Sequence, residues 1–234
     1  GFIETSGKQT LAFGGTADAS AALGIGGYWL LDPTNVLITS SVSSNGSWSG
    51  GTPDTFTGTT DPSTVSSSQI ITSLNAGTSV IISATGSVTV GDAITTTGGA
   101  SLTLSAGGAI SVDQPITSTS NALNVTLEGT TSSAITIGAN ITTNGGSLVV
   151  GASGGNSALS ITQAAATTIS AATTSFKAGT ITLNGTLPST GVTLAGDSLL
   201  INNSGAFFLD GGTLSARSIT VSGTTVDLSG TITQ

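Results

Sequence analysis

The chain lacks cysteine and histidine altogether, and its 234 residues include only three lysines and arginines together. Without cysteine there is no disulfide framework, and without either residue the common catalytic triads, thiol nucleophiles and zinc sites are absent. Basic residues are scarce and the net charge is −8, which argues against nucleic acid and anionic membranes as partners. No apolar run is long enough to span a bilayer, so we expect no membrane insertion, and nothing indicates a cofactor.

Charge of either sign is also rare, at 6% of residues, while the mean hydropathy is +0.37. Disordered chains are rich in charge and poor in β-branched apolar residues, whereas Val and Ile recur here in register. We therefore expect an ordered chain with a narrow apolar core. No signal peptide is evident, and both ends have repeat-like sequence, so we interpret the chain as an excerpt or processed product of a longer protein.

From Thr78 onward the chain repeats loosely, every twenty to twenty-five residues or so, which is typical of stacked coils. Each coil has a first predicted strand, at 79–82, 101–104, 123–127 and 147–150. A second follows at 88–90, 110–112, 135–137 and 159–161, and a third column begins at Ile94, Ile116 and Ile141. Three strands per coil predict an all-β fold, a parallel β-helix (β-solenoid).

Side chains alternate between the two faces of a strand, which assigns the core of each coil. Val80 and Ile82 are expected to point inward, with Ser79, Ile81 and Ser83 outward; Ile81 is then an exposed apolar exception. Ser and Thr suit the outer face. Stacked coils would thus carry ladders of uncharged hydroxyl groups.

We divide the chain into N-terminal coils at 1–39, an extra-helical Ser/Thr/Gly loop and link at 40–77, and coils at 78–234. The stretch 40–69 has almost no apolar period, which predicts a long surface loop or hairpin off the rod. Its aromatic residues, Trp48 and Phe56, either pin the loop to the solenoid or form a contact point for a partner or sugar. Residues 70–77 are interpreted as one helical turn or an irregular link.

Three motifs, in this order, resemble the filamentous haemagglutinin family of large adhesins exported by two-partner secretion. They are Gly1-Phe2-Ile3-Glu4-Thr5-Ser6-Gly7, Trp29-Leu30-Leu31-Asp32-Pro33-Thr34-Asn35-Val36-Leu37-Ile38, and Leu74-Asn75-Ala76-Gly77-Thr78-Ser79-Val80. Gly86–Val90 and Ala93–Gly99 are also typical, whereas residues 151–234 match only in style.

The resemblance implies a right-handed parallel β-helix on the surface of, or released from, a Gram-negative bacterium. Members of the family bind host cells, other bacteria, haem carriers or matrix. Their motifs in this region are structural, so the resemblance assigns no binding residue to this chain.

Acidic residues are the remaining candidates for chemistry, because solenoid enzymes that cleave polysaccharides use clustered Asp or Glu. Asp92 and Asp113 each follow a second strand, one coil apart, and are weak candidates for catalysis or for a metal site. Asp is also simply favoured in turns. Glycan acceptor triplets, Asn-x-Ser/Thr, begin at Asn45, Asn124, Asn140, Asn184 and Asn202.

These observations favour an extracellular or surface-bound, non-catalytic rod in adhesion or surface display, with a glycan or protein of a host or bacterial surface as partner. A second hypothesis is a structural filament whose copies stack end to end or donate a strand, because the sequence shows no obvious polar cap. A third is a polysaccharide-acting enzyme, which requires Asp92 and Asp113 to meet in an open groove.

Overall fold

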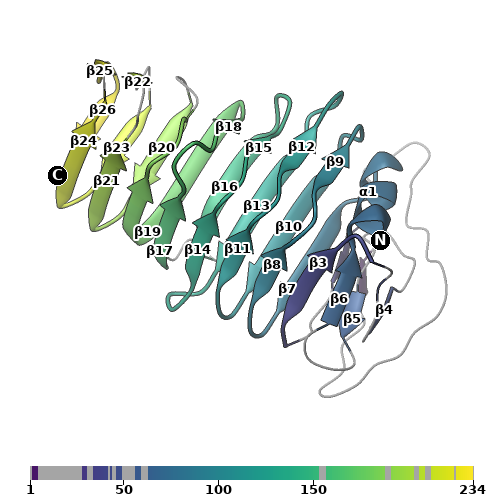
Figure 1. Ribbon diagram of the computed structural model, residues 1–234. Coiled ribbons are helices and arrows are strands. Elements are labelled where there is room, and N and C mark those ends of the chain that lie inside the picture. The colour runs from purple at the N-terminus through teal and green to yellow at the C-terminus, as the bar shows by residue number, and fades with distance from the viewer. Residues whose placement is uncertain are drawn as a thin grey trace.

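A computed structural model of the chain describes residues 2–4, 28–30, 34–41, 43, 46–48, 56–58, 63–152, 157–187, 191–202, 206–208, 212–223 and 225–233. In these residues nearly every strand pairs in parallel with a strand from the next coil, which makes a β-solenoid of about six turns (Figure 1). The all-β solenoid that the sequence predicts is thereby confirmed.

Strands of the first column begin each coil and stack along the length of the rod. Their register places Val80 beside Leu102, Leu102 beside Val125 and Val125 beside Leu148. The members in chain order are β7 (Val80–Ala84), β10 (Ser101–Ala106), β13 (Asn124–Gly129), β16 (Ser147–Ala152), the first part of β19 (Thr173–Leu183), β20 (Val192–Ala195), β23 (Thr213–Ser215) and β26 (Thr231–Thr233).

The second column follows the first around a corner of each coil. In β19 both columns belong to one continuous strand, and two successive outward residues, Gly179 and Thr180, make the corner. In spatial order the members are β6 (Ser63–Ser66), β3 (Val36–Thr39), β8 (Val88–Val90), β11 (Ile110–Val112), β14 (Ala134–Ile137), β17 (Ala158–Gln163), the second part of β19, β21 (Ser198–Asn202) and β24 (Ser218–Ser222).

A third column of short strands closes the coils. Ile116 pairs with Ile94 on one side and with Ile141 on the other, as the sequence predicts. Ile169 extends this column to a fourth strand. The strands are β9 (Ile94–Thr96), β12 (Ile116–Ser118), β15 (Ile141–Thr142) and β18 (Ile169–Ser170); β22 (Ala206–Phe208) and β25 (Thr225–Asp227) pair farther along the chain.

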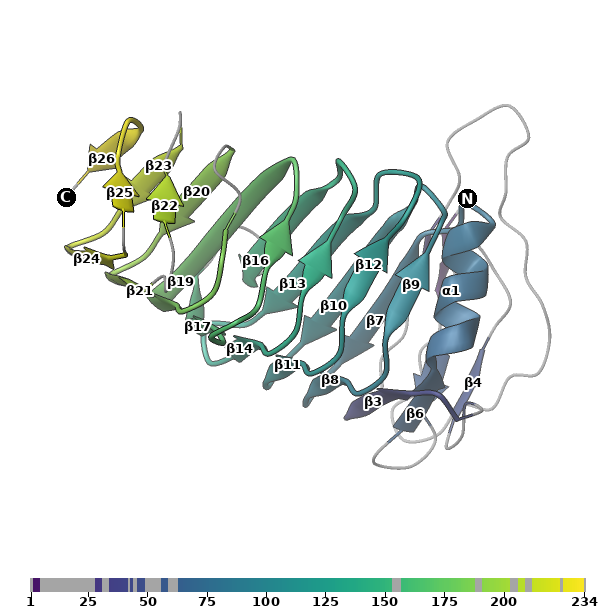
Figure 2. The same cartoon turned by 45° about the horizontal axis from the view of Figure 1, so that its top comes forward.

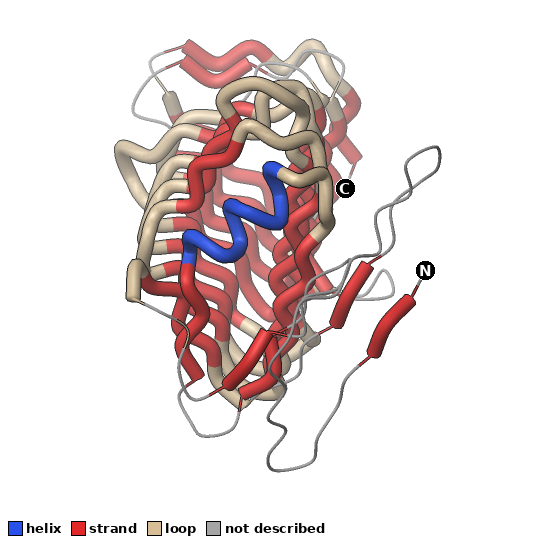
Figure 3. Tube along the Cα trace, turned by 90° about the vertical axis from the view of Figure 1, so that its right-hand side faces the viewer, coloured by secondary structure: helices blue, strands red, loops and turns tan. Residues whose placement is uncertain are grey.

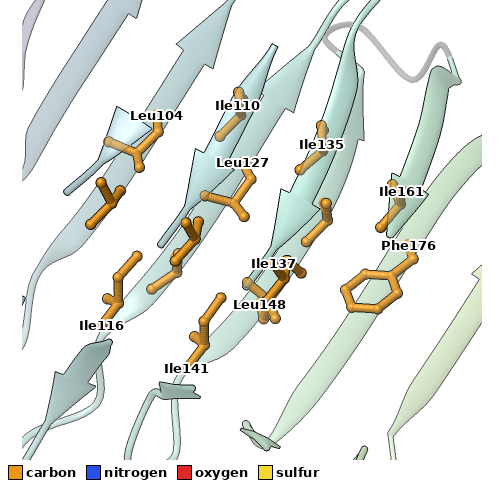
Figure 4. Packing of buried hydrophobic residues seen from close by; sticks show 14 of the residues in the cluster. Leu104, Ile110, Ile116, Leu127, Ile135, Ile137, Ile141, Leu148, Ile161 and Phe176 are labelled. Atoms are coloured by element: carbon orange, nitrogen blue, oxygen red, sulfur yellow. The ribbon is translucent and has the colours of Figure 1, made fainter. Parts of the chain in front are cut away.

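The core is a continuous apolar column inside the coils. Val80 and Ile82 are fully buried, as the alternation predicts, while Ile81 between them is half-buried rather than exposed. Each inward position repeats in the next coil, so that an aliphatic side chain stacks on another. Figure 4 shows this stacking for Leu104 and Leu127 from the first column, Ile110 and Ile135 from the second, and Ile116 and Ile141 from the third.

One helix, α1 (Ser67–Asn75), takes the place of a third-column strand in the coil between β6 and β7. Ile70 and Leu74 are fully buried on its inner face, and the helix packs against β9. Figures 2 and 3 show the helix lying across the N-terminal end of the stacked coils. The helix therefore covers the interior of the solenoid at that end.

The helix ends in a Schellman motif, which explains the Leu-Asn-Ala-Gly sequence at this point. Gly77 has a positive φ of 79°, its N–H donates to Leu74 O, and Thr78 N donates to Ser73 O. Sequence analysis expected one helical turn or an irregular link at 70–77. The structure instead begins a helix of nine residues at Ser67.

The structure differs from the expected extra-helical segment 40–77 at its C-terminal part. β6 pairs with β3 in the second column, so residues 63–66 belong to the solenoid. This strand, Ser-Thr-Val-Ser, buries two serines and contains only one apolar residue. Its apolar period is therefore too weak to recognise in the sequence.

Two strand pairs flank this end of the rod. β1 (Phe2–Glu4) pairs in parallel with β2 (Tyr28–Leu30), which lies beside β7. β4 (Gly46–Trp48) and β5 (Phe56–Gly58) form an antiparallel hairpin that lies beside β6. The hairpin agrees with the excursion predicted within 40–69; residues 49–55 and 59–62 lie outside the described part.

Candidate functional site

The acidic pair proposed from the sequence does not form a shared site. Asp92 Oδ2 accepts a hydrogen bond of 2.6 Å from Ser67 Oγ, while Asp113 Oδ1 accepts one of 2.5 Å from Ser111 Oγ. Val112 pairs with Val90, so Asp113 lies beside Gly91, and Asp92 is displaced by one residue along the turn. Each carboxylate therefore belongs to its own turn and orders local structure there.

Metal-ligating groups are dispersed over the described part of the chain. Within that part no three Asp or Glu side chains come close enough together to hold a metal ion. The one ion pair between described residues joins Arg217 Nε to Asp197 Oδ1 at 3.5 Å, with both side chains largely exposed. Such an exposed pair contributes little to stability.

Two of the five proposed glycan acceptors present their amide nitrogen outward. Asn124 Oδ1 accepts hydrogen bonds of 3.0 Å from both Ser147 N and Ser147 Oγ, and Asn140 Oδ1 accepts one of 2.7 Å from Thr168 N. Both asparagines are exposed. These bonds use the carbonyl oxygen and hold the amide in place, which leaves Nδ2, the atom that a glycan would modify, toward solvent.

The other three acceptors differ. Asn184 is half-buried, and its Nδ2 donates a 3.2 Å hydrogen bond to Gln163 O, so the acceptor atom is engaged within the fold. Asn45 lies outside the described residues, as does the side chain of Asn202. Modification of any of the five stays a prediction, for which the geometry favours Asn124 and Asn140.

The aromatic residues of the predicted contact loop lie opposite each other in the hairpin. Trp48 on β4 pairs with Phe56 on β5. Their backbone is described, whereas their side chains lie outside the described part of the structure. A facing aromatic pair across two strands is a usual way to stabilise a hairpin.

The outer faces carry columns of hydroxyl groups that follow the strand register. In the second column Thr89, Ser111, Thr136, Thr162 and Thr182 lie side by side on successive coils. Adjacent strands are spaced about 4.8 Å apart, so the column is a regular ladder of uncharged donors and acceptors. Such a face meets a partner through hydrogen bonds rather than charge.

Asparagine side chains that join neighbouring coils were not predicted from the sequence. Asn75 Oδ1, at the end of α1, accepts hydrogen bonds from Thr96 Oγ1 at 2.7 Å and from Thr97 N at 2.8 Å. Asn35 Oδ1 similarly accepts from Ser87 N at 2.7 Å. The recurrence of Asn between predicted strands was the available signal, but it shows only that a turn is present, not which coil the side chain reaches.

Comparison with known proteins leaves the fold to stand by itself. No family model, no curated protein and no solved structure matches the chain. Within the described residues, no helix combines the length and apolar character needed to cross a membrane.

Proposed function

We propose that the chain is a non-catalytic, extracellular β-solenoid rod that acts in adhesion or surface display on a Gram-negative bacterium. The observation that carries this proposal is the outer surface of the rod. Hydroxyl side chains repeat in register along it, while the acidic residues that could act in catalysis are held in separate turns. The resemblance to filamentous haemagglutinin-like adhesins supports the same role.

The proposed partner is a glycan or protein of a host or bacterial surface. An uncharged hydroxyl surface suits polar, hydrogen-bonding ligands, and the hairpin β4–β5 beside the rod provides an aromatic pair near the capped end. Aromatic rings with a polar rim are a common means of binding sugars and proteins. We assign the first contact to this hairpin.

The test is binding of the purified 234-residue chain to an array of oligosaccharides and immobilised matrix proteins. We expect saturable binding that a Trp48→Ala/Phe56→Ala double variant weakens by at least about tenfold, the loss typical of central aromatic contacts. A Thr136→Ala variant, on the outer face of a distant coil, is the matched control. Absence of binding by the native chain, or release of reducing sugar from any oligosaccharide on the array, would contradict the proposal.

The alternative function, a filament of copies stacked end to end, meets an obstacle in the structure. α1 lies across the N-terminal end of the coils and buries Ile70 and Leu74 there (Figure 3). Head-to-tail stacking would have to displace this helix. The expectation that no cap covers the coils is therefore corrected for the N-terminal end.

A further inference from the structure

The length of the coils changes abruptly in the middle of the rod. In the first column the pairing partner lies 26 residues ahead at Leu148, which pairs with Thr174, but only 18 ahead at Thr174, which pairs with Val192. In the third column Ile141 pairs with Ile169, 28 residues ahead, and Thr168 then pairs with Thr186, 18 ahead. Long coils therefore meet short coils between β17 and β20.

Two polar side chains occupy core positions at this junction, where neighbouring coils have aliphatic ones. Gln163 stands in register between Ile137 and Leu183. Thr174 stands between Leu148 and Val192. Gln163 is 0% and Thr174 1% exposed.

Each of these side chains has a buried oxygen that no described residue bonds. Gln163 Nε2 donates to Thr167 O at 3.4 Å and to Thr186 O at 3.2 Å, but Oε1 has no partner, and neither does Thr174 Oγ1. Reversing the amide would place Oε1 against two carbonyl oxygens. A buried acceptor without a partner costs the whole of its lost hydration.

The hydrogen bonds that Gln163 does make are redundant for the backbone. Thr186 N already donates to Thr167 O at 2.8 Å, and Ile169 N donates to Thr186 O at 2.9 Å. Removing the amide therefore leaves both carbonyl groups satisfied. The polar side chain weakens the coil without being needed to close it.

We propose that the junction coil, residues 158–187, is a built-in yield point: among the coils from β7 to β21 it opens first under heat or tension. The stability of a solenoid is a sum over repeats and the interfaces between them, so opening begins at its weakest interface. Opening here divides the rod into a long-coil part that carries the α1 cap and a short-coil part. The inference concerns the rod alone and is independent of the ligand that it binds.

Hydrogen exchange followed by mass spectrometry tests this directly on the 234-residue chain. We expect amides of β17 and β19 to exchange faster than amides of β10 and β13. Gln163→Leu and the nearly isosteric Thr174→Val should each slow exchange in β17 and β19 by about tenfold, the effect of relieving one unsatisfied buried oxygen. Both variants restore the residue class of the neighbouring coils.

The matched variant Ile137→Gln places the same defect one coil earlier and should speed exchange in β14. Equal protection across the interior coils would overturn the proposal. So would unchanged exchange in Thr174→Val, the variant least able to disturb folding.

Discussion

At the residue scale, the fold depends on strict alternation along very short strands. Val88 and Val90 are fully buried, while Thr89 between them faces outward on a strand of only three residues. Because the coils stack in register, each inward side chain contacts the same position of the coil before and after it. A single error in polarity therefore affects three coils.

Replacing Val88 or Ile110 by Asp should unfold the rod, because either change buries an unpaired charge. We expect the free energy of unfolding to fall by at least about 3 kcal/mol, as for other uncompensated buried charges. Thr89→Asp, on the outer face of the same strand, is the control and should change it by less than about 1 kcal/mol. Chemical denaturation followed by circular dichroism measures both, and a cooperative transition unchanged in Val88→Asp would disprove the register.

At the element scale, the helix α1 decides what one end of the molecule can do. Its inner face fills the end of the coil interior, and its C-terminal turn touches the turn that follows β9. A Cβ atom on Gly98 would lie 1.8 Å from Leu74 O, so only glycine permits this approach. The side chain of Asn75 bonds Thr97 N across the same contact.

The Leu74→Asp variant should detach the cap, since Leu74 is fully buried. We expect a lower melting temperature together with concentration-dependent association, because unpaired strand edges at the end of a solenoid are templates for pairing. Thr72→Asp adds the same charge on the exposed face of the helix and should leave the chain monomeric. Sedimentation velocity distinguishes these outcomes, and a monomeric Leu74→Asp chain as stable as the Thr72→Asp control would refute the capping role.

Much of this architecture could be predicted from the sequence, since the alternation of Val and Ile is repeated at a nearly constant interval. The prediction weakened where that signal did. β6 has one apolar residue, and α1 has only a single turn of obvious apolar spacing before its Schellman motif. The fourth strand of the third column, at Ile169, escaped notice because the interval had lengthened to 28 residues after Ile141.

The candidate sites were less predictable, because they depend on where turns meet across coils. Asp92 and Asp113 are one coil apart in sequence order, but a displacement of one residue in the register gives them different serine partners. Asn124 and Asn184 belong to equivalent sequence triplets, yet one exposes its amide nitrogen and the other donates it to Gln163 O. Triplet patterns cannot separate such cases.

At the scale of the whole molecule, the chain is a short rod with two unlike ends. The second column stacks nine strands, which at about 4.8 Å each gives a stack about 40 Å long. A helix covers the N-terminal end, whereas the last described strands, β24 to β26, are largely exposed (Figure 2). This asymmetry favours a rod that displays a surface over a subunit that polymerises through both ends.

Electron microscopy of the purified chain, with its mass confirmed by spectrometry, tests the central claim most directly. We predict isolated rods of about the length expected from the strand spacing, at every concentration at which particles can be counted. Long fibres whose axial repeat equals one 234-residue subunit would contradict the account and make the protein a structural filament.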